Sequence, residues 1–192
     1  MKKSGYEKPF RRMGSIKLPD LLSQIEEQPE LWGAVTTRQD FPGTSHGDTR
    51  TIFLRGPERM EWDCIPSVDA YGAAAFPGPY ASILAQLREL IPISELGRVM
   101  VVELAGGGVI SEHIDEGAYA EHYGRFHIAL TDSPMASLTV GGEQRNFAQG
   151  DCWWFNHQLP HSGRNSGATP RIHLIFDAVL EEAQVSSQET YA

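Results

Sequence analysis

Cysteine is nearly absent from the sequence, which has only Cys64 and Cys152 among its 192 residues. Two cysteines are too few for the disulfide frameworks that hold small secreted domains together. Their wide separation also excludes the closely spaced cysteine pairs of structural zinc sites. We therefore expect two reduced thiols and a reducing compartment, the cytoplasm.

Positive charge and long apolar runs are scarce as well. Acidic residues outnumber lysine and arginine by 25 to 16, which gives a net charge of −9. A chain this acidic lacks the extended basic surface that a nucleic acid or an anionic membrane requires. No apolar run has the length of a signal peptide core or of a membrane span. We expect a solvated tail at the one basic cluster, formed by Lys2, Lys3, Lys8, Arg11 and Arg12.

Helical patterns are limited to two segments, residues 18–27 and 80–91, where apolar residues recur at helical spacing. The run Gly106-Gly107-Gly108 precedes neither a Lys-Ser/Thr pair nor a helix, so it predicts a turn rather than a phosphate-binding loop. From residue 96 onward, short strand-like runs alternate with turns. They include a hairpin over residues 137–147 and an aromatic strand over residues 152–155.

This pattern predicts a mainly β fold, a closed barrel or jelly roll with flanking N-terminal helices laid against a sheet. The length fits a single domain over residues 1–192. Within it we expect N-terminal helices and supporting strands over 1–95, a barrel core over 96–178 and a fraying tail over 180–192.

The pattern Arg, apolar, His, apolar occurs twice, from Arg125 to His127 and from Arg171 to His173. On a β-strand, the Arg and His of each segment share one face, and the apolar residues lie on the other. A sheet with Arg and His on one face and only apolar residues on the opposite face is typical of a wall around a wet cavity. Both segments are therefore expected to line a site.

His113 and Asp115 also share one face if their segment is a strand, and they supply two corners of the facial triad that binds non-haem Fe(II). The same spacing recurs at His46 and Asp48, where the surrounding glycines predict a loop. Spacing alone therefore does not select the metal site.

The third corner should be a histidine on a later strand. We prefer His161 because Arg171 follows it by ten residues across a turn and can point into the same cavity. A guanidinium there can bind a carboxylate through two parallel hydrogen bonds. His157 is an alternative ligand, and His122 and His173 are weaker ones.

Taken in order, the motifs resemble the 2-oxoglutarate- and Fe(II)-dependent oxygenases of the aspartyl/asparaginyl β-hydroxylase group, which includes bacterial hydroxylases of free proline. The resemblance covers roughly residues 96–178. It is carried by His113 with Asp115, Arg125 with His127, the segment from Gly150 to Phe155, Leu159 to His161, and Arg171 to Asp177.

The resemblance implies a double-stranded β-helix of the cupin type, with iron bound by His113, Asp115 and His161. It further implies that Arg171 binds the distal carboxylate of 2-oxoglutarate, with Arg125 and His127 near the metal-binding end of this cosubstrate. With O2, such an enzyme hydroxylates an amino-acid side chain, free (proline-like) or peptidyl (Asp/Asn-like), and releases succinate and CO2.

The presence of Asp115 favours hydroxylation over halogenation and the proline-hydroxylase branch over the branch that lacks this carboxylate. Members of the group often have a hydroxyl residue near the position of Val102 that helps to bind 2-oxoglutarate. Valine has no hydroxyl, so the residue that assists Arg171 here is unidentified.

Substrate contacts are expected from His46, Arg50 and Arg55, which flank a strand over residues 51–54. Trp153 and Trp154 alternate faces, so at most one of them points into the cavity, and Trp154 is our candidate. The identity of the substrate and the oligomeric state do not follow from the sequence.

Two other functions fit the same residues. One is a cupin-type metal dioxygenase that binds its substrate directly on the metal and does not use 2-oxoglutarate. The other is a non-catalytic barrel that binds a small acidic ligand through Arg125 and Arg171.

Overall fold

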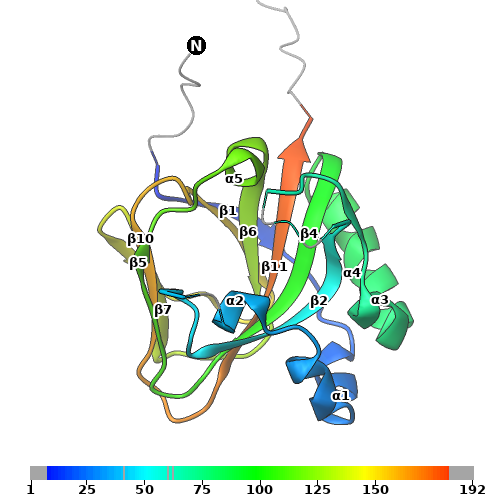
Figure 1. Ribbon diagram of the computed structural model, residues 1–192, viewed down its shortest axis with the longest axis horizontal. Helices are drawn as coiled ribbons and strands as arrows, with labels where there is room; N and C mark the ends of the chain where they lie inside the picture. Colours follow the sequence, from blue (N-terminus) through cyan, green and yellow to red (C-terminus); the bar gives the residue numbers. More distant parts are fainter. Residues whose placement is uncertain (1–7, 41, 60, 62, 182–192) are drawn as a thin grey trace, which may run out of the picture.

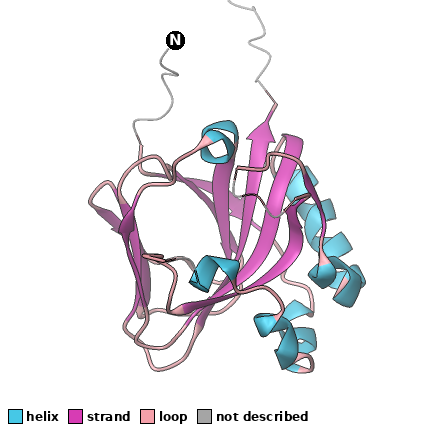
Figure 2. Cartoon of the chain, in the orientation of Figure 1, coloured by secondary structure: helices cyan, strands magenta, loops and turns pink. Residues whose placement is uncertain are grey.

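The computed structural model describes residues 8–40, 42–59, 61 and 63–181. Two β-sheets face each other, and helices cover the outer side of the larger one (Figures 1 and 2). The larger sheet consists of β1 (Phe10–Ser15), β2 (Thr49–Pro57), β3 (Ser67–Asp69), β4 (Ile93–Leu104), β6 (Gly124–Ala129), β9 (Asp151–Phe155) and β11 (Arg171–Leu180). The smaller sheet consists of β5 (Val109–His113), β7 (Ala136–Val140), β8 (Glu143–Arg145) and β10 (His161–Asn165).

Strand order identifies the architecture. The sheets run β1-β9-β6-β11-β4-β2-β3 and β5-β10-β7-β8, with antiparallel pairing throughout. From β4 to β11 the chain passes back and forth between the two sheets, and the only two consecutive strands within one sheet are the hairpin β7–β8. This winding makes a double-stranded β-helix, or cupin-like jelly roll, and confirms the predicted fold class.

The helical elements all lie outside the barrel core. They are α1 (Leu21–Glu26), the 3₁₀ helix η1 (Pro29–Gly33), α2 (Thr37–Asp40), α3 (Tyr71–Ala75), α4 (Pro77–Leu90) and α5 (Ala118–His122). The two predicted helices correspond to α1 and α4. The first begins later than expected, because Asp20 occupies the N-cap position and Leu18 and Pro19 precede it. No helix in the described part of the chain is long and apolar enough to cross a membrane.

The main hydrophobic core lies between the larger sheet and the helices. Phe126 and Ile128 of β6 and Leu174 and Phe176 of β11 point to this side and pack with residues of α4 such as Ile83. The Phe126 and Phe176 rings stack with centroids 4.8 Å apart. Because side chains alternate along a strand, the residues between them face the interior of the barrel.

The interior face carries the polar residues that the repeated pattern predicts. Register pairing sets His173 beside Ala129, Ile175 beside His127, and Asp177 beside Arg125. The prediction that Arg and His lie opposite the apolar face on both strands is confirmed. Val102 also faces inward, where it packs with Phe53, Met100 and Ile175.

Both predicted glycine turns are present. Gly107, in the turn between β4 and β5, has φ 75°. The β7–β8 hairpin turns at Gly141 and Gly142, whose φ angles of 54° and 84° match the two-residue turn that requires positive φ at both positions.

Arg11 and Arg12 are exposed to solvent, as expected, but the prediction that they belong to a tail is wrong. Both belong to β1, which pairs with β9, and Arg12 Nη2 lies 2.6 Å from Asp151 Oδ1. β1 thus pairs with the aromatic strand β9 along the edge that faces away from β6. Lys2, Lys3 and residues 182–192 of the expected C-terminal tail lie outside the described residues, and Leu180 still belongs to β11.

Residues 1–95, which were predicted to hold helices and supporting strands, contribute β1, β2 and β3 to the larger sheet. These strands widen the barrel wall beside the core strands. The single-domain division itself stays a prediction.

Replacing Phe176 by Ala should lower the free energy of unfolding by about 3–5 kcal/mol, because a fully buried ring is removed from a close-packed core. Chemical denaturation followed by circular dichroism measures the change. Met135→Ala is the matched control, since this side chain is 61% exposed and should contribute little. Equal stability of the two variants would contradict the placement of the main core.

Candidate active site

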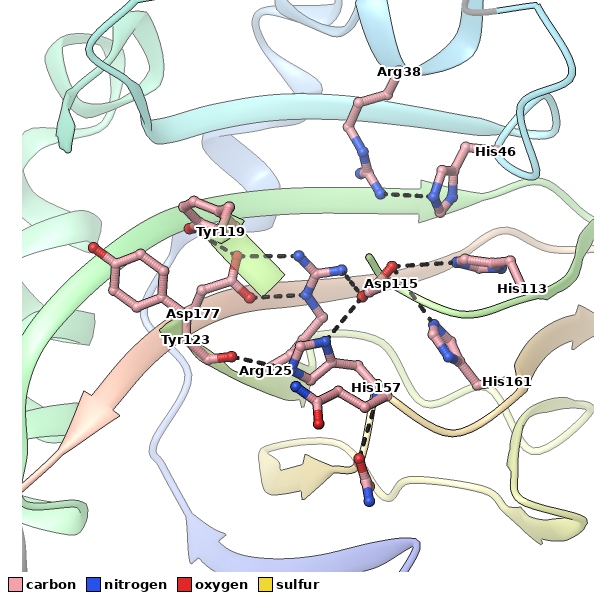
Figure 3. A network of polar contacts seen from close by, with 12 residues as sticks. Arg38, His46, His113, Asp115, Tyr119, Tyr123, Arg125, His157, His161 and Asp177 are labelled. Atoms are coloured by element: carbon pink, nitrogen blue, oxygen red, sulfur yellow. Dashed lines mark hydrogen bonds and ion pairs between the residues drawn. The ribbon is translucent and has the colours of Figure 1, made fainter. Parts of the chain in front are cut away.

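Three predicted metal ligands converge at one end of the barrel. His161 of β10 pairs directly with His113 of β5, and Asp115 follows β5, tied by its backbone N–H to the carbonyl oxygen of His157 at 3.1 Å. One possible ligand atom from each of His113, Asp115 and His161 lies within 4.8 Å of the other two. Asp115 Oδ1 is 3.6 Å from His113 Nε2 and 3.9 Å from His161 Nε2 (Figure 3).

Hydrogen bonds fix which nitrogen of each histidine faces the cluster. His113 Nδ1 donates to the carbonyl oxygen of Ser111 at 2.8 Å, and His161 Nδ1 donates to that of Leu159 at 2.9 Å. Because Nδ1 carries a proton in each ring, the neutral form of either ring has its Nε2 lone pair directed towards a carboxylate oxygen. Three electron-rich atoms facing one another repel unless a cation lies among them. The donor set fits a divalent ion of the facial-triad class.

The second oxygen of Asp115 is held by a buried ion-pair network. Arg125 Nη1 donates to Asp115 Oδ2 at 2.5 Å, and its Nε and Nη2 donate to Asp177 at 2.8 and 3.2 Å (Figure 3). Burial opposes ionisation of Asp115, but Arg125, His157 and His161 outweigh it and hold the pKa of the carboxyl well below its usual range. Asp115 is therefore a carboxylate, with one oxygen fixed and the other free for a ligand bond.

Asp177 is a site residue that sequence reasoning did not single out. Its side chain is 1% exposed, and Tyr119 of α5 donates a hydrogen bond to its Oδ2 at 3.1 Å. In the sequence, Asp177 is the last inward-facing position of the alternating pattern that begins at Arg171. The missing signal was its partner, because no local pattern relates it to Arg125, 52 residues earlier.

Arg171 lies deeper in the barrel, in the wall of a small pocket with Ser137, Asn146 and Phe147. It is 2% exposed, and its Nε and Nη2 have no hydrogen-bond partner among the described residues. Burial lowers the pKa of its guanidinium to about 10, which still leaves it charged at neutral pH. A buried cation without a counter-ion is costly and marks a binding position for an anion.

A pair of neutral histidines lines the same pocket region. His127 Nδ1 and His173 Nδ1 are 3.3 Å apart, and the His173 ring stacks on Phe147. Burial, reinforced by the charge of Arg171, holds the pKa values of both rings well below the ordinary range. Since one of the two Nδ1 atoms must donate and the other accept, the rings hold opposite tautomers.

The alternative ligands occupy other positions. His157 Nδ1 lies 3.4 Å from Asp115 Oδ2, on the side of Arg125 rather than on the open side. The half-exposed His122 binds Glu95 at 3.0 Å, and His173 contacts His127. Among the described residues, the cluster of His113, Asp115 and His161 is the one with metal-binding geometry.

His46 and Asp48, the second His-Asp pair of the sequence, make different contacts. Asp48 Oδ2 accepts a hydrogen bond from the backbone N–H of Val109 at 2.9 Å, so it fastens the loop to β5. His46 instead packs edge-on against His113, with ring centroids 5.2 Å apart. His46 therefore borders the triad, as its proposed role in substrate contact requires.

Three expected substrate contacts, Arg50, Arg55 and Trp154, lie away from the triad. The two arginines are bound by other residues. Arg50 points to the outer side of β2, where it binds Glu103 at 2.7 Å and lies over Trp32. Arg55 follows a bulge in β2 and is bound by the Leu96 carbonyl oxygen and by Asp69, each at 3.3 Å.

Trp154 packs against the main core, on the helix side of the sheet. The alternation prediction for the tryptophan pair holds, but Trp153 is the inward residue and stacks on Phe147 with a centroid distance of 5.5 Å. Choosing Trp154 as the substrate contact was therefore wrong, because the register of β9 turns it outward.

Arg38 of α2 is a further residue near the site that no sequence pattern indicated. Its guanidinium reaches from α2 towards His46 and the interior of the barrel (Figure 3). A four-residue helix with one arginine carries no motif, so only the fold could bring it here.

Comparison with known proteins agrees with this geometry. A family model described as aspartyl/asparaginyl β-hydroxylase matches residues 74–180, more than half of the chain. The chain belongs to the aspartyl/asparaginyl β-hydroxylase family. The resemblance read from the sequence motifs is thereby confirmed at the level of the family.

Among curated relatives of this chain is L-proline cis-4-hydroxylase from Rhizobium meliloti (strain 1021), 26% identical over 135 residues. The match covers 68% of this chain and 48% of that protein, so the chain spans about half the length of this relative.

Solved structures resemble this chain only in part. A cupin 2 conserved barrel domain protein from Salinispora arenicola CNS-205 is 19% identical, with 68% and 76% of the two chains covered and a TM-score of 0.38. The cupin domain of an XRE family transcriptional regulator from Enterobacter cloacae is also 19% identical, with 44% and 82% covered and a TM-score of 0.36. The fold assignment rests on the strand pairing instead.

Replacing Arg125 by Lys should weaken metal binding about 10- to 100-fold, the usual effect of disturbing the residue that orients a ligand. Lysine keeps the charge but cannot bridge Asp115 and Asp177 through a planar fork. Anaerobic calorimetric titration with Fe(II) measures the affinity, and Arg88→Lys on the exposed face of α4 is the control. Unchanged affinity would show that Asp115 is held without Arg125.

Proposed function

We propose that this β-hydroxylase family member is an Fe(II)- and 2-oxoglutarate-dependent dioxygenase that hydroxylates an amino-acid side chain and releases succinate and CO2. The observation that carries the proposal is Arg171, a buried and unpartnered cation in the same barrel interior as the triad. A triad alone fits several metal enzymes, whereas an anion-binding arginine beside it fits a keto-acid cosubstrate with a second carboxylate.

Metal binding is assigned to His113 Nε2, Asp115 Oδ1 and His161 Nε2. Iron held there would supply oxygen activation coupled to oxidative decarboxylation of 2-oxoglutarate. The chain's own contribution is to hold these ligands before the metal arrives. Backbone carbonyls orient both histidines, and Arg125 orients Asp115.

Arg171 is assigned to the distal carboxylate of 2-oxoglutarate. Its Nε and Nη2 are the adjacent pair of donors that a carboxylate accepts side by side, and both lack partners among the described residues. The neutral His127 and His173 rings lie near this arginine, and the ring that accepts at Nδ1 carries its proton on Nε2, where it can donate to the cosubstrate. Their neutral state avoids adding a second and third buried cation to the pocket.

Arg125 takes a different role from the one that the resemblance implied. Two of its nitrogens are bound by Asp177 and a third by Asp115, so its guanidinium is directed at protein carboxylates. We assign it to positioning Asp115. The same occupancy disfavours a non-catalytic barrel that binds an acidic ligand through Arg125 and Arg171 together.

Adding Fe(II) and 2-oxoglutarate to the wild-type protein without oxygen should produce a weak visible charge-transfer band. In Arg171→Ala the 2-oxoglutarate concentration needed for the band should rise about 30-fold or more, because truncating one partner of a buried charge pair costs about 2–5 kcal/mol. Anaerobic absorbance titration measures both.

Arg88→Ala, on the exposed face of α4, is the matched control and should titrate like the wild type. A wild-type protein that binds Fe(II) but gives no band at any 2-oxoglutarate concentration would instead favour a metal dioxygenase without this cosubstrate.

A further inference from the structure

We propose that Arg38, together with His46, forms the receptor for a carboxylate of the substrate, which makes the substrate an amino acid bound through a carboxylate next to the metal centre. This inference deepens the proposed function and rests on it. Neither residue lies within the family match of residues 74–180. The receptor is therefore supplied by this chain's own N-terminal segment.

Arg38 is a buried cation without a carboxylate partner. Arg38 is 8% exposed. Its Nη1 lies 3.3 Å from Thr51 Oγ1, and its Nη2 lies 3.3 Å from His46 Nε2. No carboxylate of the described residues lies within ion-pair distance of it. A guanidinium carries five N–H donors, and these contacts use two of them. Burying such a group costs free energy unless an anion compensates.

His46 adds an unused donor beside it. Because arginine can only donate, His46 Nε2 must accept from Arg38, which places the ring proton on Nδ1. That Nδ1 is buried and has no hydrogen-bond partner among the described residues. The ring lies edge-on to His113, so the unused N–H belongs to the immediate surroundings of the triad. Figure 3 shows Arg38 and His46 opposite Arg125 and Asp115.

The charge of Arg38 is offset only at a distance. Arg38 and Arg125 together balance the nearby buried carboxylates of Asp115 and Asp177, but both carboxylates are bound to Arg125. A divalent ion on the triad would turn this balance into a positive excess. In a chain of net charge −9, such an excess would be the opposite of the average and would suit an anionic ligand.

The position of Arg38 separates its role from that of Arg171. Arg38 enters from α2, which Figure 1 shows beside β2 and between the two sheets, and its Thr51 contact lies on β2. Arg171 lies in the pocket lined by residues of β7, such as Ser137 and Leu138. The two unpartnered arginines thus serve two different carboxylates, one of the cosubstrate and one of the substrate.

Calorimetry can test the receptor without turnover. We would titrate the wild-type protein and Arg38→Gln with the free protein-type L-amino acids, their carboxamides, and N-acetyl aspartyl and glutamyl amides. Titrations are made anaerobically, with and without Fe(II) and 2-oxoglutarate. The tightest wild-type ligand should be a carboxylate that binds at least about 10-fold more tightly than its amide. Free acids and acetylated side-chain acids distinguish an α-carboxylate from a side-chain carboxylate.

In Arg38→Gln the affinity for that ligand should fall about 10-fold or more, while the affinity for 2-oxoglutarate stays within about twofold. Arg38→Lys should retain part of the affinity, because it keeps the charge without the fork. Arg88→Gln is the control and should bind like the wild type. The melting temperatures of all variants show whether they fold.

Three results would overturn the proposal: equal affinity of a folded Arg38→Gln, equal binding of acid and amide by the wild type, or no bound member of the panel. Parallel loss of 2-oxoglutarate affinity would also overturn it by placing Arg38 in the cosubstrate site. Failure of the proposed function looks different, because amino-acid binding would still depend on Arg38 while 2-oxoglutarate produced no charge-transfer band.

Discussion

The ion-pair chain from Asp115 through Arg125 to Asp177 is the interaction on which the candidate site depends. It joins the end of β5 to β6 and β11, and so fastens the smaller sheet to the larger one where the ligands converge. Removing one member would leave its partners as buried unpaired charges, which is far more costly than never having buried them. This ion-pair chain also gives the two oxygens of Asp115 different roles. Oδ2 is bound by Arg125, while Oδ1 faces the two histidines.

Two kinds of buried arginine would explain how the barrel binds the two proposed ligands. Arg125 is neutralised by protein carboxylates and acts as framework. Arg171 and Arg38 have no protein carboxylate within ion-pair distance among the described residues, so each keeps unused donors directed into the interior. Their burial costs stability in the ligand-free protein, and that cost is recovered when an anion binds. The site is thus preorganised for anions in a chain that is acidic as a whole.

Much of the fold could be predicted from periodicity. Alternation along residues 125–130 and 171–176 correctly separated the core face from the site face, and the glycine pair at 141–142 correctly placed a hairpin. The same alternation left the choice between Trp153 and Trp154 open, because a period of two fixes opposite faces but not which face is inward. The register against β1 and β6 decides it.

Long-range partners were the other limit. The triad followed from spacing and from the resemblance, and the structure brings its three ligands together. Asp177, Tyr119 and Arg38 act through contacts with residues far along the chain, which a single sequence does not reveal. Arg50 and Arg55 failed for the same reason, since Glu103 and Asp69 bind them away from the triad.

The most direct test of the central claim is a coupled product measurement. Wild-type protein would be incubated with Fe(II), 2-oxoglutarate, O2 and the amino acid that binds most tightly, and succinate and hydroxylated product would be quantified together. The account predicts that both form in a one-to-one ratio and that neither forms when 2-oxoglutarate is omitted. Hydroxylated product at an undiminished rate without 2-oxoglutarate would contradict it.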